Sequence, residues 1–169
     1  MAKQMQLWLA AAAMLLAICE AELTTNATEQ YLQPHNEARA AVGVAPLQWS
    51  RTLASKASTL AAHPPGSSSC DFFNETAYFN YGVNQAVAYV LDSPETVVKL
   101  WVEEGRRYYN YACNSCAAPE HKAECESYTQ VVWRKTVKLG CGKGGCGKDG
   151  SHHICLYYPP GNVPGEKPY

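Results

Sequence analysis

Apolar residues recur at helical spacing in three stretches of the chain. The first predicted helix is Thr28–Gly43, with an apolar side formed by Leu32, His35, Ala38 or Arg39, and Val42. Ser50 caps a second helix that stops at His63–Gly66, and its apolar face holds Leu53, Ala54, Ala57, Leu60 and Ala61. A third opens on Ser93, Pro94 and Glu95, ends at Gly105, and turns Val97, Val98, Trp101 and Val102 inward.

Other stretches have the composition of strands. Tyr128–Leu139 is rich in β-branched and aromatic residues, and the glycine-rich turn Gly142–Gly147 leads to a second strand, His152–Tyr158. This predicts a hairpin pinned by cysteines. Tyr81–Leu91 reads as a strand entered through Gly82. The end of the chain, Pro159–Tyr169, is rich in proline and glycine, so we expect an extended tail.

The first 21 residues are typical of a secretory signal peptide. The apolar run Leu7–Ile18 is too short to span a bilayer, and small residues precede a cleavage point after Ala21. A buried N-terminal helix is the alternative. Residues 22–169 then form a single domain. The net charge of −1 and the lack of a basic block argue against a nucleic-acid partner.

Secretion favours paired cysteines. Of eight cysteines, Cys19 leaves with the signal peptide and seven remain, and their spacing does not choose among the pairings. A zinc site is an alternative use of one group, because it contains ligand types: Cys113, Cys116, His121 and Cys125. We favour disulfides, since an oxidising compartment supplies the partners.

Two further features concern the surface. Asn26 and Asn74 each begin a glycosylation sequon. An aromatic loop is a candidate for lipid contact, although such residues also pack beneath disulfide-anchored loops: Phe72, Phe73, Tyr78, Phe79 and Tyr81. His35 is expected to be a hydrogen-bonded histidine inside the fold. His152 and His153 should point to opposite faces of their strand.

The strings HNEARAAVGVAPLQWS, YTQVVWRKTVKLGC and CLYYPPGNVPGEKPY occur here in the order found in plant pathogenesis-related-1-type proteins. The chain resembles this family, part of the superfamily of cysteine-rich secretory proteins, antigen 5 and pathogenesis-related-1 proteins, from about Tyr31 to Tyr169. YGVNQ and the ending PPGNVPGEKPY look most like the pistil-expressed branch. The resemblance implies an α+β fold, and the predicted elements agree with it: a three-layer α-β-α sandwich around a small antiparallel sheet, stapled by disulfides.

The resemblance also implies specific cysteine pairs and a known cleft. The implied pairs are Cys70–Cys141, Cys116–Cys125 and Cys146–Cys155, which leave Cys113 unpaired, and we favour a buried thiol over a link to another molecule. Many superfamily members have a cleft with two His and two Glu that can bind a divalent metal. The matching positions here are degenerate: Asn74, Val83, Glu104 and Ser127. Only Glu104 keeps a ligand type, so we expect no physiological zinc and no other cofactor.

Enzyme signatures are lacking in the sequence, which contains neither a GxSxG elbow nor an HExxH pair. We therefore expect no catalytic residues. The resemblance implies instead a protein of the apoplast or cell wall, defensive or reproductive, that holds a sterol or other lipid in an apolar groove. One alternative is a precursor whose C-terminal segment, Pro159–Tyr169, is released as a signalling peptide and meets a cell-surface receptor. Another is an extracellular protein-binding module. We expect a monomer without a membrane span.

Overall fold

The fold is built on a four-stranded sheet. In the computed structural model, residues 6, 27–62, 70–72, 80–89 and 93–169 are described. The strand order is β1-β5-β6-β2, in which β1 runs parallel to β5 and the other neighbours are antiparallel. The four strands are β1 (Gln48–Trp49), β2 (Gly82–Ala88), β5 (Lys138–Cys146) and β6 (Gly150–Tyr158).

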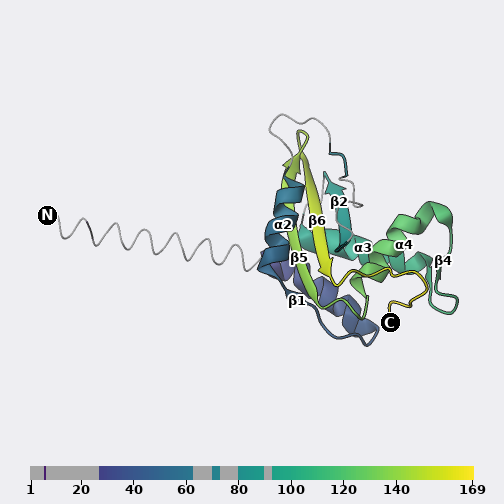
Figure 1. The fold of residues 1–169 in the computed structure, drawn as a ribbon. Helices are drawn as coiled ribbons and strands as arrows, with labels where there is room; N and C mark the ends of the chain where they lie inside the picture. The colour runs from purple at the N-terminus through teal and green to yellow at the C-terminus, as the bar shows by residue number, and fades with distance from the viewer. Residues whose placement is uncertain (1–5, 7–26, 63–69, 73–79, 90–92) are drawn as a thin grey trace.

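Helices cover both faces of this sheet (Figure 1). On one face lies α2, and on the other lie the helix over residues 27–41 and α3, against which α4 packs. A small hairpin of β3 and β4 and the 3-10 helix η2 join α3 to α4. The bounds of these elements are α2 (Arg51–Ala61), α3 (Pro94–Tyr108), β3 (Tyr109–Asn110), β4 (Ser115–Cys116), η2 (Pro119–His121) and α4 (Lys122–Val131). The expected α-β-α sandwich is confirmed.

Alternate glycines on β5 allow α2 to lie directly on the sheet. A Cβ atom at Gly140, Gly142 or Gly144 would collide with backbone atoms of α2. Because alternate residues of a strand share a face, the three glycines form one smooth track for the helix. The core beside it is made of Leu53, Ala57, Ala61, Ile154 and Leu156.

The opposite face of the sheet contacts the 27–41 helix through buried polar groups as well as apolar ones. The hydroxyl of Tyr31 is 2.8 Å from Nδ1 of His153, and Nε2 of His35 is 2.8 Å from the hydroxyl of Tyr157. All four side chains are buried. His35 is therefore the hydrogen-bonded interior histidine that the sequence predicts. His153 contacts Tyr31 on one face of the sheet, and His152 contacts Gln85 at 3.2 Å on the other face.

The buried guanidinium of Arg39 joins the 27–41 helix to the end of α4. Its Nε donates to the carbonyl of Ala45 at 2.7 Å, and its Nη1 donates to those of Val131 and Trp133 at 3.0 and 2.9 Å. Nη2 donates to the carbonyl of Thr136 at 2.9 Å. Burial lowers the pKa of Arg39 to about 10. Four backbone carbonyls thus satisfy a charge that lies almost wholly inside the protein.

The predicted strand Tyr128–Leu139 is wrong. Its first part belongs to α4, and β5 begins only at Lys138. Cys125, Tyr128 and Val132 recur at helical spacing and are buried, and the backbone of α4 lies against Gly105 of α3. Packing of this face outweighs the strand preference of the β-branched residues. Gly105 accordingly does not end α3, which continues to Tyr108.

Two of the implied disulfide pairs are also wrong. The structure pairs Cys141 with Cys155 and Cys70 with Cys146, while Cys116–Cys125 agrees with the implied pair. The register explains the exchange, because Cys141 lies directly opposite Cys155 in the hairpin. Cys113 forms no disulfide and is exposed, so the expected burial of its thiol is wrong.

Several expectations fall outside the described residues. They are the signal peptide, both glycosylation sites and three aromatic residues of the lipid-contact loop: residues 1–21, Asn26, Asn74, Phe73, Tyr78 and Phe79. The strand predicted to reach Leu91 is described as far as Ala88. Within the part of the chain that is described, no helix is long and apolar enough to cross a membrane.

We expect the free energy of unfolding to fall as the pH drops from 6.5 to 4. Burial lowers the pKa of His35 from 6.5 to about 4, against the opposing effect of its hydrogen bond to the Tyr31 carbonyl. In this window the unfolded chain binds the proton and the folded chain does not, so folding loses about 1.4 kcal/mol per pH unit from this group.

The measurement is urea unfolding at several pH values across that window. His35→Gln should flatten the pH dependence, whereas Val163→Ala, at an exposed residue that does not titrate, should leave it unchanged. Equal slopes for the wild type and His35→Gln would contradict the assignment.

Candidate functional site

The described positions of the family cleft lie on three elements that meet. Val83 is on β2, Glu104 on α3 and Ser127 on α4 rather than in a hairpin, and Asn74 lies outside the described residues. Gly105 contacts the backbone of α4, and Nδ2 of Asn84 donates to the carbonyl of Ser127 at 2.9 Å. The folding of the chain therefore brings these elements together as in a cleft.

The described side chains at this cleft do not come together as a set of metal ligands. Val83 packs against the apolar cluster under α2, and the hydroxyl of Ser127 donates within its own helix to the Ala123 carbonyl at 2.9 Å. Glu104 accepts from Arg107 at 3.3 Å. Among the described residues, no group of three or more His, Cys, Asp or Glu could hold a metal ion. These residues do not fit the metal that the resemblance associates with the cleft.

The alternative zinc group is not assembled either. Cys116 and Cys125 are joined in a disulfide, so neither offers a thiolate. The ring of His121 stacks on that of Tyr108 with centroids 3.9 Å apart. Cys113 lies in the exposed turn of the β3–β4 hairpin, where its sulfur accepts from the Ser115 hydroxyl at 3.4 Å.

A cavity of about 630 Å³ beside the sheet is large enough to take a ligand. It lies where the 27–41 helix, β1, α2, β5 and the start of α3 meet. We call it the Tyr31–Trp49 pocket, and its lining residues are Ala27, Thr28, Tyr31, Trp49, Arg51, Ala54, Ser58, Pro94, Cys141, Gly142 and Lys143. The sequence does not indicate this pocket, because its residues come from four separated stretches of the chain and form no motif.

Aromatic rings and small residues make up most of the wall of this pocket. The rings of Tyr31 and Trp49 are nearly parallel, with an interplanar angle of 19° and centroids 6.4 Å apart. The Tyr31 hydroxyl is turned toward His153, so it is the ring that contributes to the wall. The volume falls within the range of small-molecule pockets, roughly 300–1,000 Å³.

A second apolar groove, of about 470 Å³, lies between β2 and α3. Val87, Val97 and Leu100 form part of its wall, and Lys99 and Glu103 contribute one charge of each sign. Lys99 pairs with Glu95 one turn earlier on α3. This groove is therefore smaller than the Tyr31–Trp49 pocket, and its charged residues favour neither an anion nor a cation.

The described part of the predicted lipid-contact loop lies away from the Tyr31–Trp49 pocket lining. The Phe72 side chain is 59% exposed, and its ring is 5.8 Å from that of His152. Tyr81 is partly buried and packs near the ring of Tyr158 at 6.2 Å. These two residues are not among those that line the pocket.

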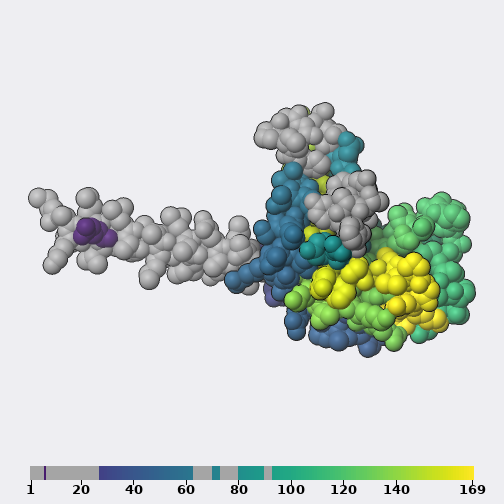
Figure 2. Space-filling model, in the orientation of Figure 1, coloured from purple at the N-terminus to yellow at the C-terminus, as the bar shows by residue number. Residues whose placement is uncertain are grey.

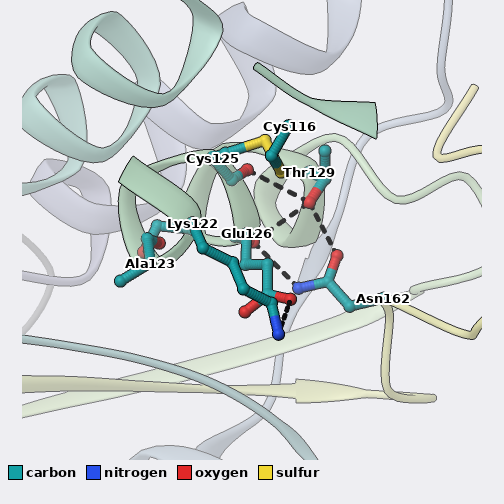
Figure 3. A network of polar contacts seen from close by, with 8 residues as sticks. Cys116, Lys122, Ala123, Cys125, Glu126, Thr129 and Asn162 are labelled. Carbon is teal, nitrogen blue, oxygen red and sulfur yellow. Dashed lines mark hydrogen bonds and ion pairs between the residues drawn. A yellow bond between two sulfur atoms is a disulfide. The ribbon is translucent and has the colours of Figure 1, made fainter. Parts of the chain in front are cut away.

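The C-terminal tail is fastened to α4 by side-chain hydrogen bonds (Figure 3). The hydroxyl of Thr129 donates to Oδ1 of Asn162 at 2.7 Å, and Nδ2 of Asn162 donates to the Glu126 carbonyl at 2.9 Å. The backbone N–H of Gly161 donates to Oε1 of Gln130 at 2.8 Å. The start of the tail is thus held along two turns of one helix.

Further contacts hold the tail to its last residue. The N–H of Arg134 donates to the carbonyl of buried Pro168 at 2.7 Å. The ring of Tyr169 stacks on that of Tyr111, with centroids 4.9 Å apart. In Figure 2 the tail, in yellow, lies along the surface next to the green residues of the β3–β4 region and α4. The tail is therefore a packed part of the domain.

Comparisons with known sequences and structures show which proteins this chain is similar to. The profile of the cysteine-rich secretory protein family matches residues 32–158. The STS14 protein of Solanum tuberosum is 40% identical over 86% of this chain, which spans 66% of that protein. Pathogenesis-related leaf protein 4 of Solanum lycopersicum is 42% identical over 92% of each chain. The structure of venom allergen-like protein 4 of Schistosoma mansoni has a TM-score of 0.59 at 27% identity, covering 82% of this chain and 90% of that one.

We expect zinc titrated into the protein to show no stoichiometric site, because Val83 and Ser127 leave Glu104 as the one carboxylate at the described cleft positions. Isothermal titration calorimetry checks this. The double variant Val83→Glu with Ser127→His is the positive control, since it adds two ligand types on elements that meet. A stoichiometric micromolar site in the wild type would contradict the prediction.

We expect loss of the Asn162 side chain to destabilise the domain by about 1–2 kcal/mol, because two hydrogen bonds to α4 disappear. Asn162 has a φ of 54°, so Asn162→Gly removes the contacts without strain, and Asn162→Ala should cost about 1 kcal/mol more. Urea unfolding measures both, with Val163→Ala, at an exposed neighbour, as control. Unchanged stability of Asn162→Gly would show that these bonds do not hold the tail.

Proposed function

Because the chain belongs to the cysteine-rich secretory protein family, with plant pathogenesis-related-1 proteins among its relatives, we propose that it is a secreted, defence-related protein that binds a sterol or another lipid. The observation that carries this proposal is the Tyr31–Trp49 pocket, with its volume of about 630 Å³ and its wall of rings and small side chains. The family comparison supports the class of protein, and the pocket supports the kind of ligand.

The shape of the pocket favours a flat or elongated apolar ligand. The ring of Trp49 is partly exposed and stacks on the buried ring of Tyr31, so Trp49 offers the flat surface on which a fused ring system can pack. Ala54, Pro94 and Gly142 border this surface without long side chains. Burial of apolar area contributes about 25 cal/mol per Å², so such a wall favours a ligand with little polar surface.

A binding role also agrees with the state of the family cleft. The described positions offer one carboxylate, a hydroxyl bonded within its helix and a valine. General acid–base or nucleophilic catalysis needs a base within hydrogen-bond reach of the reacting group. Among the described residues, the Ser127 hydroxyl donates to the Ala123 carbonyl and not to the side chain of a base. A non-enzymatic function is therefore favoured.

The same relatives and the disulfides support a place outside the cell. The family is described as secretory, and three disulfides fit an oxidising environment. We place the protein in the apoplast or cell wall. The contacts of residues 159–169 with α4 favour a bracing role for the tail over release as a signalling peptide.

We expect the protein purified from the medium of a secreting host to bind sitosterol saturably and one to one. Ala54→Phe places a ring in the pocket and should weaken binding by about tenfold or more. Thr52→Phe is the matched control, because Thr52 is exposed on the same helix and does not line the pocket.

The affinity of the wild type, Ala54→Phe and Thr52→Phe is measured by equilibrium binding of radiolabelled sitosterol. Absence of saturable binding to the wild type would overturn the proposed function. Equal weakening of binding by both variants would show that the ligand does not bind in this pocket.

A further inference from the structure

We propose that the Tyr31–Trp49 pocket selects amphiphiles that carry an anionic head group, so that an acidic derivative of a sterol binds more tightly than the neutral sterol. This inference rests on the proposed function, since it concerns the ligand class of the same pocket. It depends on the charged residues of the pocket, whereas the proposed lipid binding depends on its apolar wall.

The charges lining this pocket have one sign. Arg51, the first residue of α2, and Lys143 of β5 both contribute to the lining, and both residues are exposed. The described lining residues include no Asp or Glu. An anion at the pocket therefore lies near the guanidinium of Arg51, and the ammonium of Lys143, which has contacts of its own, adds to the positive charge.

The guanidinium of Arg51 is available to a ligand. It forms no hydrogen bond or ion pair with any other described residue. Lys99, by contrast, is paired with Glu95, and Lys135 is paired with Glu166 at 2.6 Å. A planar guanidinium can donate two parallel hydrogen bonds to a carboxylate, sulfate or phosphate, which makes Arg51 the principal head-group contact.

The apolar and cationic parts of the pocket suit the two ends of one molecule. Tyr31 and Trp49 form the aromatic surface, while Arg51 lies two residues after Trp49 at the point where β1 leads into α2. The ring of Trp49 and the guanidinium of Arg51 therefore come from neighbouring positions in the chain. Hydroxyls of Thr28 and Ser58 also line the pocket and can serve an oxygen-rich head group.

A neutral sterol uses only part of this arrangement. Its single hydroxyl can donate one hydrogen bond and accept two, but it has no charge to pair with the cations at the pocket. The groove between β2 and α3 differs in this respect, because Lys99 and Glu103 there offset each other. Charge selection is therefore a property of the Tyr31–Trp49 pocket and distinguishes it from the other apolar groove.

The test compares two probes of the same apolar body, sitosterol and sitosterol 3-sulfate, on the secreted protein. The wild type should bind the sulfate about tenfold more tightly, the low end for a charge-assisted contact at an exposed site. The double variant Arg51→Glu with Lys143→Glu should lose this preference, because both positive charges are reversed. A urea-unfolding midpoint like that of the wild type shows that the variant is folded.

Lys148→Glu is the matched control, because Lys148 is exposed in the turn between β5 and β6 and does not line the pocket. It should keep the preference for the sulfate. A preference lost equally in this variant reflects net charge and overturns the assignment to Arg51 and Lys143. Equal affinity of the wild type for both probes overturns charge selection and leaves the proposed function standing. Binding of neither probe overturns the proposed function itself.

Discussion

The buried guanidinium of Arg39 is the interaction on which the arrangement of the helices depends. It bonds to carbonyls of the loop after the 27–41 helix and of the segment between α4 and β5. A charge taken out of water must keep every one of these partners, because each unsatisfied polar group costs about 1–3 kcal/mol. One turn earlier, Asn36 exchanges hydrogen bonds with the backbone of Leu47 at 2.7 and 3.3 Å and so positions β1. The same helix thereby fixes the sheet edge that borders the Tyr31–Trp49 pocket.

Local signals in the sequence predicted much of this fold. The serine caps at Ser50 and Ser93 lie where the structure has them, and each accepts the expected backbone hydrogen bond. The strand ending at Tyr158 is also confirmed. The error over residues 128–139 has a tertiary cause, since Gly105 lets α4 approach α3 closely enough for its β-branched residues to bury as a helix. Local preference could not reveal that contact.

The site was less predictable than the fold. Identities at three positions of the family cleft could be assigned from motifs, because Val83, Glu104 and Ser127 each lie in or beside a recognisable string. Disulfide pairing could not, since the pairing of Cys141 with Cys155 is fixed by the register of two strands and not by spacing. The Tyr31–Trp49 pocket could not be predicted for a similar reason. Tyr31, Trp49, Arg51 and Lys143 become neighbours only after the 27–41 helix packs on the sheet.

The partners of the 27–41 helix have a consequence for biosynthesis. Tyr31 and His35 bond to His153 and Tyr157 across 122 residues of sequence. At a synthesis rate of roughly 5–20 residues per second, the helix waits roughly 6–24 s before those strand residues exist. During that interval its apolar side has no sheet to cover, and contacts of such long sequence separation also form slowly. A nascent chain of this protein is therefore most exposed to chaperones, and to aggregation, through the helix over residues 27–41.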